Sequence, residues 1–424
     1  MNKSRSRETA RSLQLVFTCA LAALALLGGL SLARGESSER GHARWVASWS
    51  AAPMADGTTL SAASRAFDDQ TVRQIVQISA GGSHVRVELS NEYGVVPLVV
   101  GAAHVAVQAA GSSIVAESDR TLTFDGNPSV VIAPGDSVRS DAVRLRVASQ
   151  SNLAISIYAP EPTGTATFHA FGNQTAYVSA AGDFTGAIEF PSAETSTSRY
   201  WLTYVEVLPP RRIGALVALG DSITDGGEST LDANRRWTDF LSRRINPPQA
   251  RPRLAVLNQG IGCGRLLRDF CGPSAVSRFE RDVLDTTGVT AVVLASGFVD
   301  IFFATAAGNP AEITSAEEII AGLSALAREA RQQGLAVYGA TYTPNEDTTF
   351  GNVFTPENEA KRQAVNAWIR TTSELDAVFD FDAAVRDPER PTRLLPEYAS
   401  ADRLHLSDAG YEALANAVDL AVLR

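Results

Sequence analysis

The feature that most constrains the fold is a change of pattern at Pro209-Pro210-Arg211-Arg212, a stiff polar linker between two differently patterned parts. After the linker, short apolar runs alternate with amphipathic segments that have helical spacing, such as 316–334 and 357–375. The runs are ALVALG (215–220), RLAVLNQG (253–260), TAVVLASG (290–297) and LAVYGATYTP (335–344). Strands that alternate with helices predict a parallel α/β sheet covered on both faces, within a domain at 213–424.

The part before the linker has the pattern of an all-β domain. Short alternating runs are separated by Gly, Pro, Asn and Asp turn signals, which is typical of an antiparallel sandwich. We expect this β-sandwich domain to cover residues 45–207. Its predicted strands lie at 71–79, 83–90, 130–140, 142–147, 152–159, 175–179 and 201–208.

The N-terminus has the pattern of a leader segment. Basic residues precede the apolar run LQLVFTCALAALALLGGLSLA, which ends in small residues. This arrangement predicts a secretory signal peptide over residues 1–33, cleaved after Ala33, and hence a secreted or periplasmic protein. An uncleaved membrane anchor is the alternative, because the run is nearly long enough to span a bilayer.

Charge and cysteine content narrow the possible partners. The chain has a formal net charge of −10, and residues 1–33 carry +3 of it, so the mature chain would carry −13. Such acidity argues against nucleic acid or anionic membranes as partners. Export would leave two cysteines, Cys263 and Cys271, which we predict to form a disulfide in an oxidising compartment. No His or second Cys pair near them has metal-ligand spacing, so no metal site is predicted.

The loop GDSITDGG (220–227) follows the first strand of the α/β part. Functional loops gather at the carboxyl ends of such strands, and Ser222 stands at the strand-to-helix turn with its hydroxyl near a helix N-terminus. A phosphate loop would need a Gly-Lys-Ser/Thr ending, which is absent. The remaining interpretations are an N-cap serine and a nucleophile.

A serine nucleophile needs a base. The chain has five histidines, and only His405 lies in the α/β part, in ADRLHLSDAGY before the last predicted helix. Asp402, three residues upstream, could hold the imidazole in the tautomer that accepts a serine proton. A surface turn is the alternative for an isolated Asp-x-x-His, but its combination with Ser222 favours a catalytic triad.

The blocks GDSITDG, VLNQGI, DANRRW and DRLH resemble those of the SGNH/GDSL hydrolases, a superfamily of serine esterases and acylhydrolases. The segments RWVASWSAAP and VRVELSNEYG are similar to a secreted bacterial branch with an N-terminal β-domain. The resemblance implies a flavodoxin-like three-layer domain that needs no cofactor. It also implies that Ser222 is the nucleophile, His405 the base and Asp402 the orienting acid.

Two family blocks differ here at the positions that bind the oxyanion. In NQGIGCG, Cys263 stands where the family has a donor glycine, and in Gly297-Phe298-Val299-Asp300, Val299 stands where it has an asparagine. The backbone N–H of Cys263 can still donate beside that of Ser222, although a positive φ would strain a cysteine. Valine has no side-chain donor, and losing one donor typically costs about 10²–10³ in rate.

The residues around Val299 invite two interpretations. Phe298 and Val299 begin an apolar stretch that is either packing or a substrate-binding wall for an acyl chain. Asp300 is interpreted as structural, capping loop N–H groups. Arg235, Arg236 and Trp237 are interpreted as helix surface and core, without a substrate role.

Together these features predict a carboxylic ester hydrolase with a small-molecule or glycan ester substrate, slow or re-specialised because of Val299. A catalytically degraded carbohydrate-binding homologue is the first alternative, favoured by Val299. An acyl transferase is the second, with an alcohol replacing water in deacylation. The retained Ser222, Asp402 and His405 favour an enzyme.

Overall fold

A parallel sheet carries the candidate site. The computed structural model describes residues 45–56 and 64–423, so the signal peptide predicted at 1–33 lies outside the described residues. The sheet has five strands in the order β17-β16-β18-β19-β20. Their bounds are β16 Gly214–Gly220, β17 Leu254–Gly260, β18 Val289–Ala295, β19 Ala336–Ala340 and β20 Ala377–Phe379. In chain order this is the flavodoxin-like arrangement 2-1-3-4-5, and the predicted fold class is confirmed.

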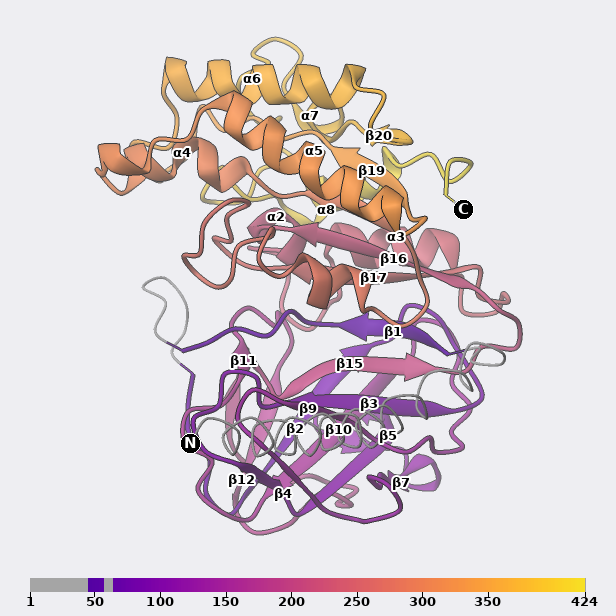
Figure 1. The fold of residues 1–424 in the computed structure, drawn as a ribbon. Coiled ribbons are helices and arrows are strands. Elements are labelled where there is room, and N and C mark those ends of the chain that lie inside the picture. Colours follow the sequence, from indigo (N-terminus) through magenta and orange to yellow (C-terminus); the bar gives the residue numbers. More distant parts are fainter. Residues whose placement is uncertain (1–44, 57–63, 424) are drawn as a thin grey trace, which may run out of the picture. The chain divides into compact units, whose positions relative to one another are not determined.

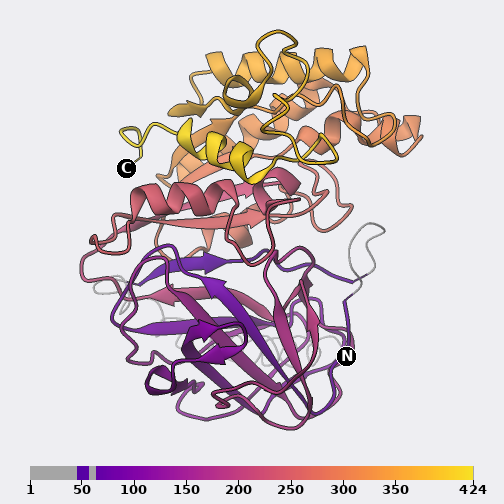
Figure 2. The ribbon, with the colours of Figure 1, turned by 180° about the vertical axis from the view of Figure 1, so that it is seen from behind.

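Helices cover both faces of this sheet (Figures 1 and 2). One face carries α3 (Trp237–Ile245), α7 (Phe381–Val385) and α8 (Asp408–Asn416), and the other carries α5 (Ala316–Gln332) and α6 (Pro356–Thr371).

Alternate residues of β16 explain why its sequence is apolar throughout. Leu216 packs in the cluster of Trp237, whereas Val217 packs in the cluster of Ile319 on the opposite face. A strand with both faces buried has no polar side to show.

Helix α4 (Phe298–Ala306) and strand β20 are among the elements of the α/β part that were not predicted. Helix α4 follows β18, but its sequence FVDIFFATA is almost entirely apolar and hides the helical period. It begins directly after Gly297, whose φ of 115° suits glycine. Strand β20 has three residues, too few for a periodic signal.

The N-terminal region is antiparallel and rich in short strands, as predicted. One sheet has the order β1-β15-β3-β9, and a larger one has β13-β12-β2-β10-β5-β6, with β7 beside β5. The first comprises β1 Val46–Ser50, β15 Leu202–Val207, β3 Val85–Ser90 and β9 Ser137–Arg139. The second comprises β13 Ser192–Ser196, β12 Ala176–Ala181, β2 Gln70–Gln77, β10 Asn152–Ala159, β5 Ala102–Ala110, β6 Ser113–Ile114 and β7 Arg120–Thr121. Two further ladders pair β4 (Leu98–Val100) with β8 (Val130–Ile132) and β11 (Phe168–His169) with β14 (Arg199–Tyr200).

One predicted strand is wrong. Residues 142–147 make only isolated bridges, Val143 to Val85 and Val147 to Gly82. Their side chains still alternate between solvent and interior, which is the pattern that predicted a strand, but they form no continuous ladder. Strand β5, by contrast, was not predicted.

The antiparallel and parallel parts share one hydrophobic cluster. Val46 and Val205 belong to the same cluster as Val217, and Ser50 Oγ donates to the Asn258 carbonyl at 3.0 Å. Residues Trp45–Arg424 accordingly form one compact unit. The division into a β-sandwich domain at 45–207 and a hydrolase domain at 213–424 stays a prediction. Within the described ranges, every helix is too short or too polar to cross a bilayer.

Candidate active site

Ser222 is held at a sharp turn between β16 and the one-turn helix α2 (Ser222–Asp225). Asp221 caps this helix, with Oδ1 accepting the Ile223 N–H at 3.0 Å. Glycine is required on two strands here because the helix lies so close. A Cβ on Gly220 would lie 2.1 Å from Thr224 Oγ1, and one on Gly260 would lie 2.2 Å from the Asp225 backbone nitrogen. The turn places Ser222 at the carboxyl end of the sheet, beside the point where the strand order reverses.

His405 faces the serine from the segment before α8. Its Nε2 lies 2.8 Å from Ser222 Oγ, and its Nδ1 lies 2.6 Å from Asp402 Oδ2. Because the carboxylate accepts the Nδ1 proton, Nε2 presents a lone pair to the serine hydroxyl. Gly227 leaves room for the ring, since a Cβ there would lie 2.8 Å from His405 Cδ2. The structure thus brings the three residues of the predicted triad together.

Asp402 is itself fixed by its own loop. Its Oδ1 accepts the N–H groups of Leu404 and His405, each at 2.9 Å, and the Ser400 hydroxyl at 2.7 Å. Burial works to raise the pKa of Asp402, but the hydrogen bond and charge of His405 outweigh it and hold the pKa well below its usual range. Asp402 therefore stays ionised and orients the imidazole at neutral and mildly acid pH.

A second acid lies directly beneath the serine. Burial raises the pKa of Asp221 to about 7, against the Ile223 N–H and the charge of His405, which lower it. Asp221 does not touch the imidazole in the way that Asp402 does. Its geometry is that of a helix cap that holds the turn.

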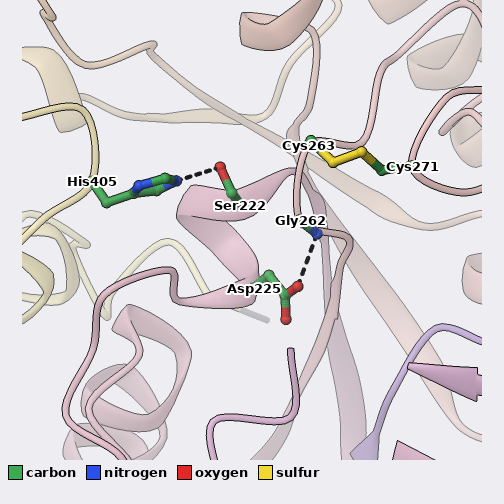
Figure 3. Close-up of a disulfide and its surroundings, with 6 residues drawn as sticks. All are labelled: Ser222, Asp225, Gly262, Cys263, Cys271 and His405. Carbon is green, nitrogen blue, oxygen red and sulfur yellow. Dashed lines mark hydrogen bonds between the residues drawn. A yellow bond between two sulfur atoms is a disulfide. The ribbon is translucent and has the colours of Figure 1, made fainter. Parts of the chain in front are cut away.

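The loop after β17 carries the predicted disulfide and the predicted oxyanion donor (Figure 3). Cys263 and Cys271 are joined by a disulfide, and Cys263 has a φ of 53°, the strained conformation that a glycine would adopt freely. The N–H of its neighbour Gly262 is occupied by Asp225 Oδ2 at 2.8 Å. Within residues 45–56 and 64–423, the backbone N–H groups of Cys263 and Ser222 have no acceptor.

The residues that follow β18 are less exposed than a substrate wall would suggest. Phe298 and Val299 are 4% and 5% exposed, and both belong to the main hydrophobic cluster. Phe298 packs against Phe302 and Tyr342. Their assignment as substrate-binding residues stays a prediction, whereas their packing role is evident.

Asp300 is structural, as predicted. Its carboxylate accepts the Leu266 N–H at 2.6 Å and the Leu267 N–H at 3.3 Å, and Arg265 lies 3.5 Å away. It thereby ties α4 to the disulfide loop. Burial raises the pKa of Asp300, an effect opposed by these hydrogen bonds.

His169 was not predicted as a site residue. It lies in β11 and bonds to Asp225, which also binds the loop after β17. His169 Nε2 lies 3.0 Å from Asp225 Oδ1, and its Nδ1 lies 2.9 Å from the Ala52 carbonyl oxygen. A carbonyl only accepts, so Nδ1 carries a proton. The contact between Nε2 and Asp225 Oδ1 requires one proton between the two atoms, so His169 and Asp225 form a buried hydrogen bond. No local spacing links His169 to Asp225, and the only signal was a histidine in a histidine-poor chain.

The interpretation of Arg236 as helix surface is wrong. It is the N-cap of α3, and its guanidinium points inward instead of lying on the helix surface. Nε donates to the Asp225 carbonyl at 2.6 Å, and Nη2 donates to the Gly172 carbonyl at 2.6 Å. It therefore joins the end of α2 to the antiparallel part. Trp237 is fully buried, as predicted.

Comparison with known proteins identifies the α/β part. Residues 218–413 match the GDSL-like lipase/acylhydrolase family. This part of the chain is therefore a GDSL/SGNH hydrolase domain, of a family that acts on acyl esters, and the resemblance seen in the sequence is confirmed. No curated protein matches the chain significantly.

Comparison with solved structures finds similarity at low sequence identity, as two of the matches illustrate. A GDSL-like lipase from Bacteroides thetaiotaomicron is 17% identical, with 49% of this chain and 87% of that chain covered and a TM-score of 0.37. A variant of the acetyl xylan esterase Axe2 from Geobacillus stearothermophilus is 23% identical, with coverage of 48% and 94% and a TM-score of 0.38.

The Asp225 interactions lead to a prediction about stability. Replacing Asp225 by Ala should lower the free energy of unfolding by about 2–6 kcal/mol, because it leaves two buried groups, His169 Nε2 and the Gly262 N–H, without a hydrogen-bond partner at roughly 1–3 kcal/mol each. Asp225→Asn, which keeps an oxygen for Gly262, should cost less. Urea denaturation measures both.

An exposed ion pair provides the control. Glu194 pairs with Arg65 at 2.7 Å near the surface, and Glu194→Ala should cost no more than about 1 kcal/mol. Equal losses in Asp225→Ala and Glu194→Ala would contradict the role given to Asp225.

Proposed function

We propose that this chain is an exported carboxylic ester hydrolase in which Ser222 is the nucleophile. The observation that carries the proposal is the row of hydrogen bonds from Ser222 Oγ through His405 to Asp402, at 2.8 and 2.6 Å. A serine beside a neutral imidazole, itself oriented by an ionised carboxylate, is equipped for acyl transfer. The family match over 218–413 supports the same class of reaction.

The chemistry proceeds in two halves. His405 Nε2 takes the hydroxyl proton as Ser222 Oγ attacks the ester carbonyl, and then gives it to the departing alkoxide. Asp402 stabilises the imidazolium that exists between these steps. Water, deprotonated by the same nitrogen, attacks the acyl-serine and releases the acid. No step requires a metal or organic cofactor.

The oxyanion is held by backbone donors alone in this proposal. The free N–H groups of Ser222 and Cys263 are available for it, and the disulfide holds Cys263 in the conformation that the loop requires. Val299 supplies no donor, so we expect slower acylation than an asparagine would allow.

Two exposed aromatic side chains favour an ester with an apolar part. Phe350 is 49% exposed and lies edge-on to the His405 ring, with the ring centroids 6.5 Å apart. Phe171 contacts the oxyanion loop, since a Cβ on Gly262 would lie 2.5 Å from its ring. Aromatic surfaces of this kind stack on sugar rings and pack on acyl chains, so a small-molecule or glycan ester fits this rim.

Kinetics of paired variants test the triad. The wild-type chain should hydrolyse p-nitrophenyl acetate and butyrate, whereas Ser222→Ala and His405→Ala should each lower kcat by at least about 10³-fold. The double variant should lose no more than either single one, because the residues act as a unit.

Ser129→Ala is a matched control, because this exposed serine has no hydrogen-bonded side chain in the described structure. Wild-type rates equal to those of Ser222→Ala would leave the degraded, carbohydrate-binding alternative. Diversion of product from acid to a new ester by added alcohol would favour the transferase.

Val299→Asn tests the effect of the side-chain oxyanion donor that valine lacks. Val299→Asn should raise kcat toward simple esters by about 10-fold or more, part of the roughly 10²–10³ that one oxyanion donor contributes. Val299→Ile controls for a change of volume without a donor and should not raise the rate. No gain in Val299→Asn, with Ser222 still essential, would mean that another group holds the oxyanion.

Export is tested on the chain itself. The presence of the Cys263–Cys271 disulfide supports an oxidising compartment. Expressed in a bacterial host, the protein should appear in the periplasm or medium with Arg34 as its first residue, as determined by mass spectrometry. A full-length chain in the membrane fraction would instead support the uncleaved anchor.

A further inference from the structure

A polar cavity lies where the antiparallel strands meet the α/β part, on the side of α2 away from His405. It encloses about 560 Å³ of empty space, part of it open to solvent. Its charged lining residues are Arg199, Arg236, His169, Asp225 and Asp239. Nothing in the proposed ester hydrolysis uses it.

Arg199 is the exceptional residue in this lining. It is 2% exposed, yet among the described residues its Nε and Nη1 have no hydrogen-bond partner and no carboxylate forms an ion pair with it. Its one contact is a long one, from Nη2 to the Gly172 carbonyl at 3.5 Å. Buried guanidinium groups are normally paired, because an unpaired charge in the interior is costly.

The charges around Arg199 do not neutralise it. Burial lowers the pKa of Arg199 to about 9, with Arg236 lowering it further and Asp232 opposing them. The group therefore stays protonated at neutral pH. Asp232 is already engaged, because it accepts the N–H and hydroxyl of Thr175 at 2.6 Å each.

The carboxylates of the two acids in the lining accept hydrogen bonds from groups other than Arg199. The Asp225 carboxylate accepts from His169 and from the Gly262 N–H. Asp239 accepts the backbone N–H of Arg236 at 3.0 Å. Among the described residues neither carboxylate accepts a hydrogen bond from Arg199, whose Nε and Nη1 remain unpaired donors in the lining.

The ladder between β11 and β14 places the side chains of His169 and Arg199 in the lining of this cavity. His169 and Arg199 are directly opposed in the ladder, and such pairs project to the same side. Arg236 approaches from the start of α3, where its Nη1 is 4.0 Å from Asp239 Oδ2. The lining thus holds two guanidinium groups, and Nε and Nη1 of Arg199 are unpaired, in a chain whose net charge is −10.

We propose that this cavity binds a small oxyanion, a carboxylate or a phosphate, through the unpaired donors of Arg199. Guanidinium groups bind the oxygens of both ligands with charge-assisted hydrogen bonds. The bound anion would supply the missing partner of Arg199 and would lie beside Asp225, at the end of α2 opposite the serine.

The test uses the full mature chain and follows its Tm with increasing acetate, phosphate or chloride at constant ionic strength. A ligand that binds only the folded state raises Tm with its concentration. We expect acetate or phosphate to raise Tm by at least about 2 °C at saturation. The anion that does so assigns the ligand chemistry. No saturable rise, or an equal rise with chloride, would overturn the proposal.

Substitution of Arg199 separates binding from packing. Arg199→Met should have an anion-free Tm no lower than that of the wild type, because it removes an unpaired buried charge, and its response to the anion should disappear. Arg146→Met, at an exposed arginine without a bonded side chain in the described structure, should respond as the wild type does. An intact response in Arg199→Met would place the anion elsewhere.

Calorimetry keeps the proposal testable if Arg199→Met does not fold. Titration of the wild-type chain with the active anion should give one site per chain, and Arg199→Lys should weaken binding by about 10-fold, since lysine lacks the planar fork. More than one site, or unchanged affinity in Arg199→Lys, would contradict a site built on Arg199.

Discussion

The Asp225 carboxylate is the interaction on which the arrangement of the site depends. Asp225 is the last residue of the one-turn helix that begins with Ser222. Its carboxylate binds His169 from the antiparallel part and the Gly262 N–H from the disulfide loop. A single side chain therefore sets the relative positions of the nucleophile turn, the oxyanion loop and the strand β11. The absence of a Cβ on Gly260 permits this contact, because the backbone of Asp225 lies directly above it.

The disulfide loop shows how one substitution is accommodated. Cys263 adopts a positive φ that a glycine would adopt without strain, and the covalent bond to Cys271 together with the Asp300 contacts to Leu266 and Leu267 holds the loop in place. The backbone N–H of Cys263 therefore remains available for the oxyanion in the proposed reaction. Val299 has no equivalent remedy, because a side-chain donor cannot be replaced by holding the backbone.

The antiparallel part does more than cover one side of the α/β part. His169 bonds to Asp225 at the end of α2, and the Gly172 carbonyl accepts from Arg236 at the start of α3. Arg199 is a buried guanidinium from the same antiparallel part, and its Nη2 shares the Gly172 carbonyl with Arg236. The Asp225 interactions and the anion cavity share these residues. Asp225 joins the cavity and the loop after β17, because it lines the cavity and accepts the Gly262 N–H of that loop.

The sequence by itself determined the class of fold and the triad. Buried strands can be recognised in the sequence as uncharged apolar runs. Ser222, Asp402 and His405 lie in sequence blocks whose residue types and spacing indicate a nucleophile, an acid and a base. Helix α4 escaped because its uniformly apolar sequence hides the helical period. Only the tertiary structure decided that His169 pairs with Asp225, that Arg236 turns inward and that Nε and Nη1 of Arg199 have no partner among the described residues. These contacts join residues far apart in the chain, and burial, which no local pattern encodes, sets their energetic weight.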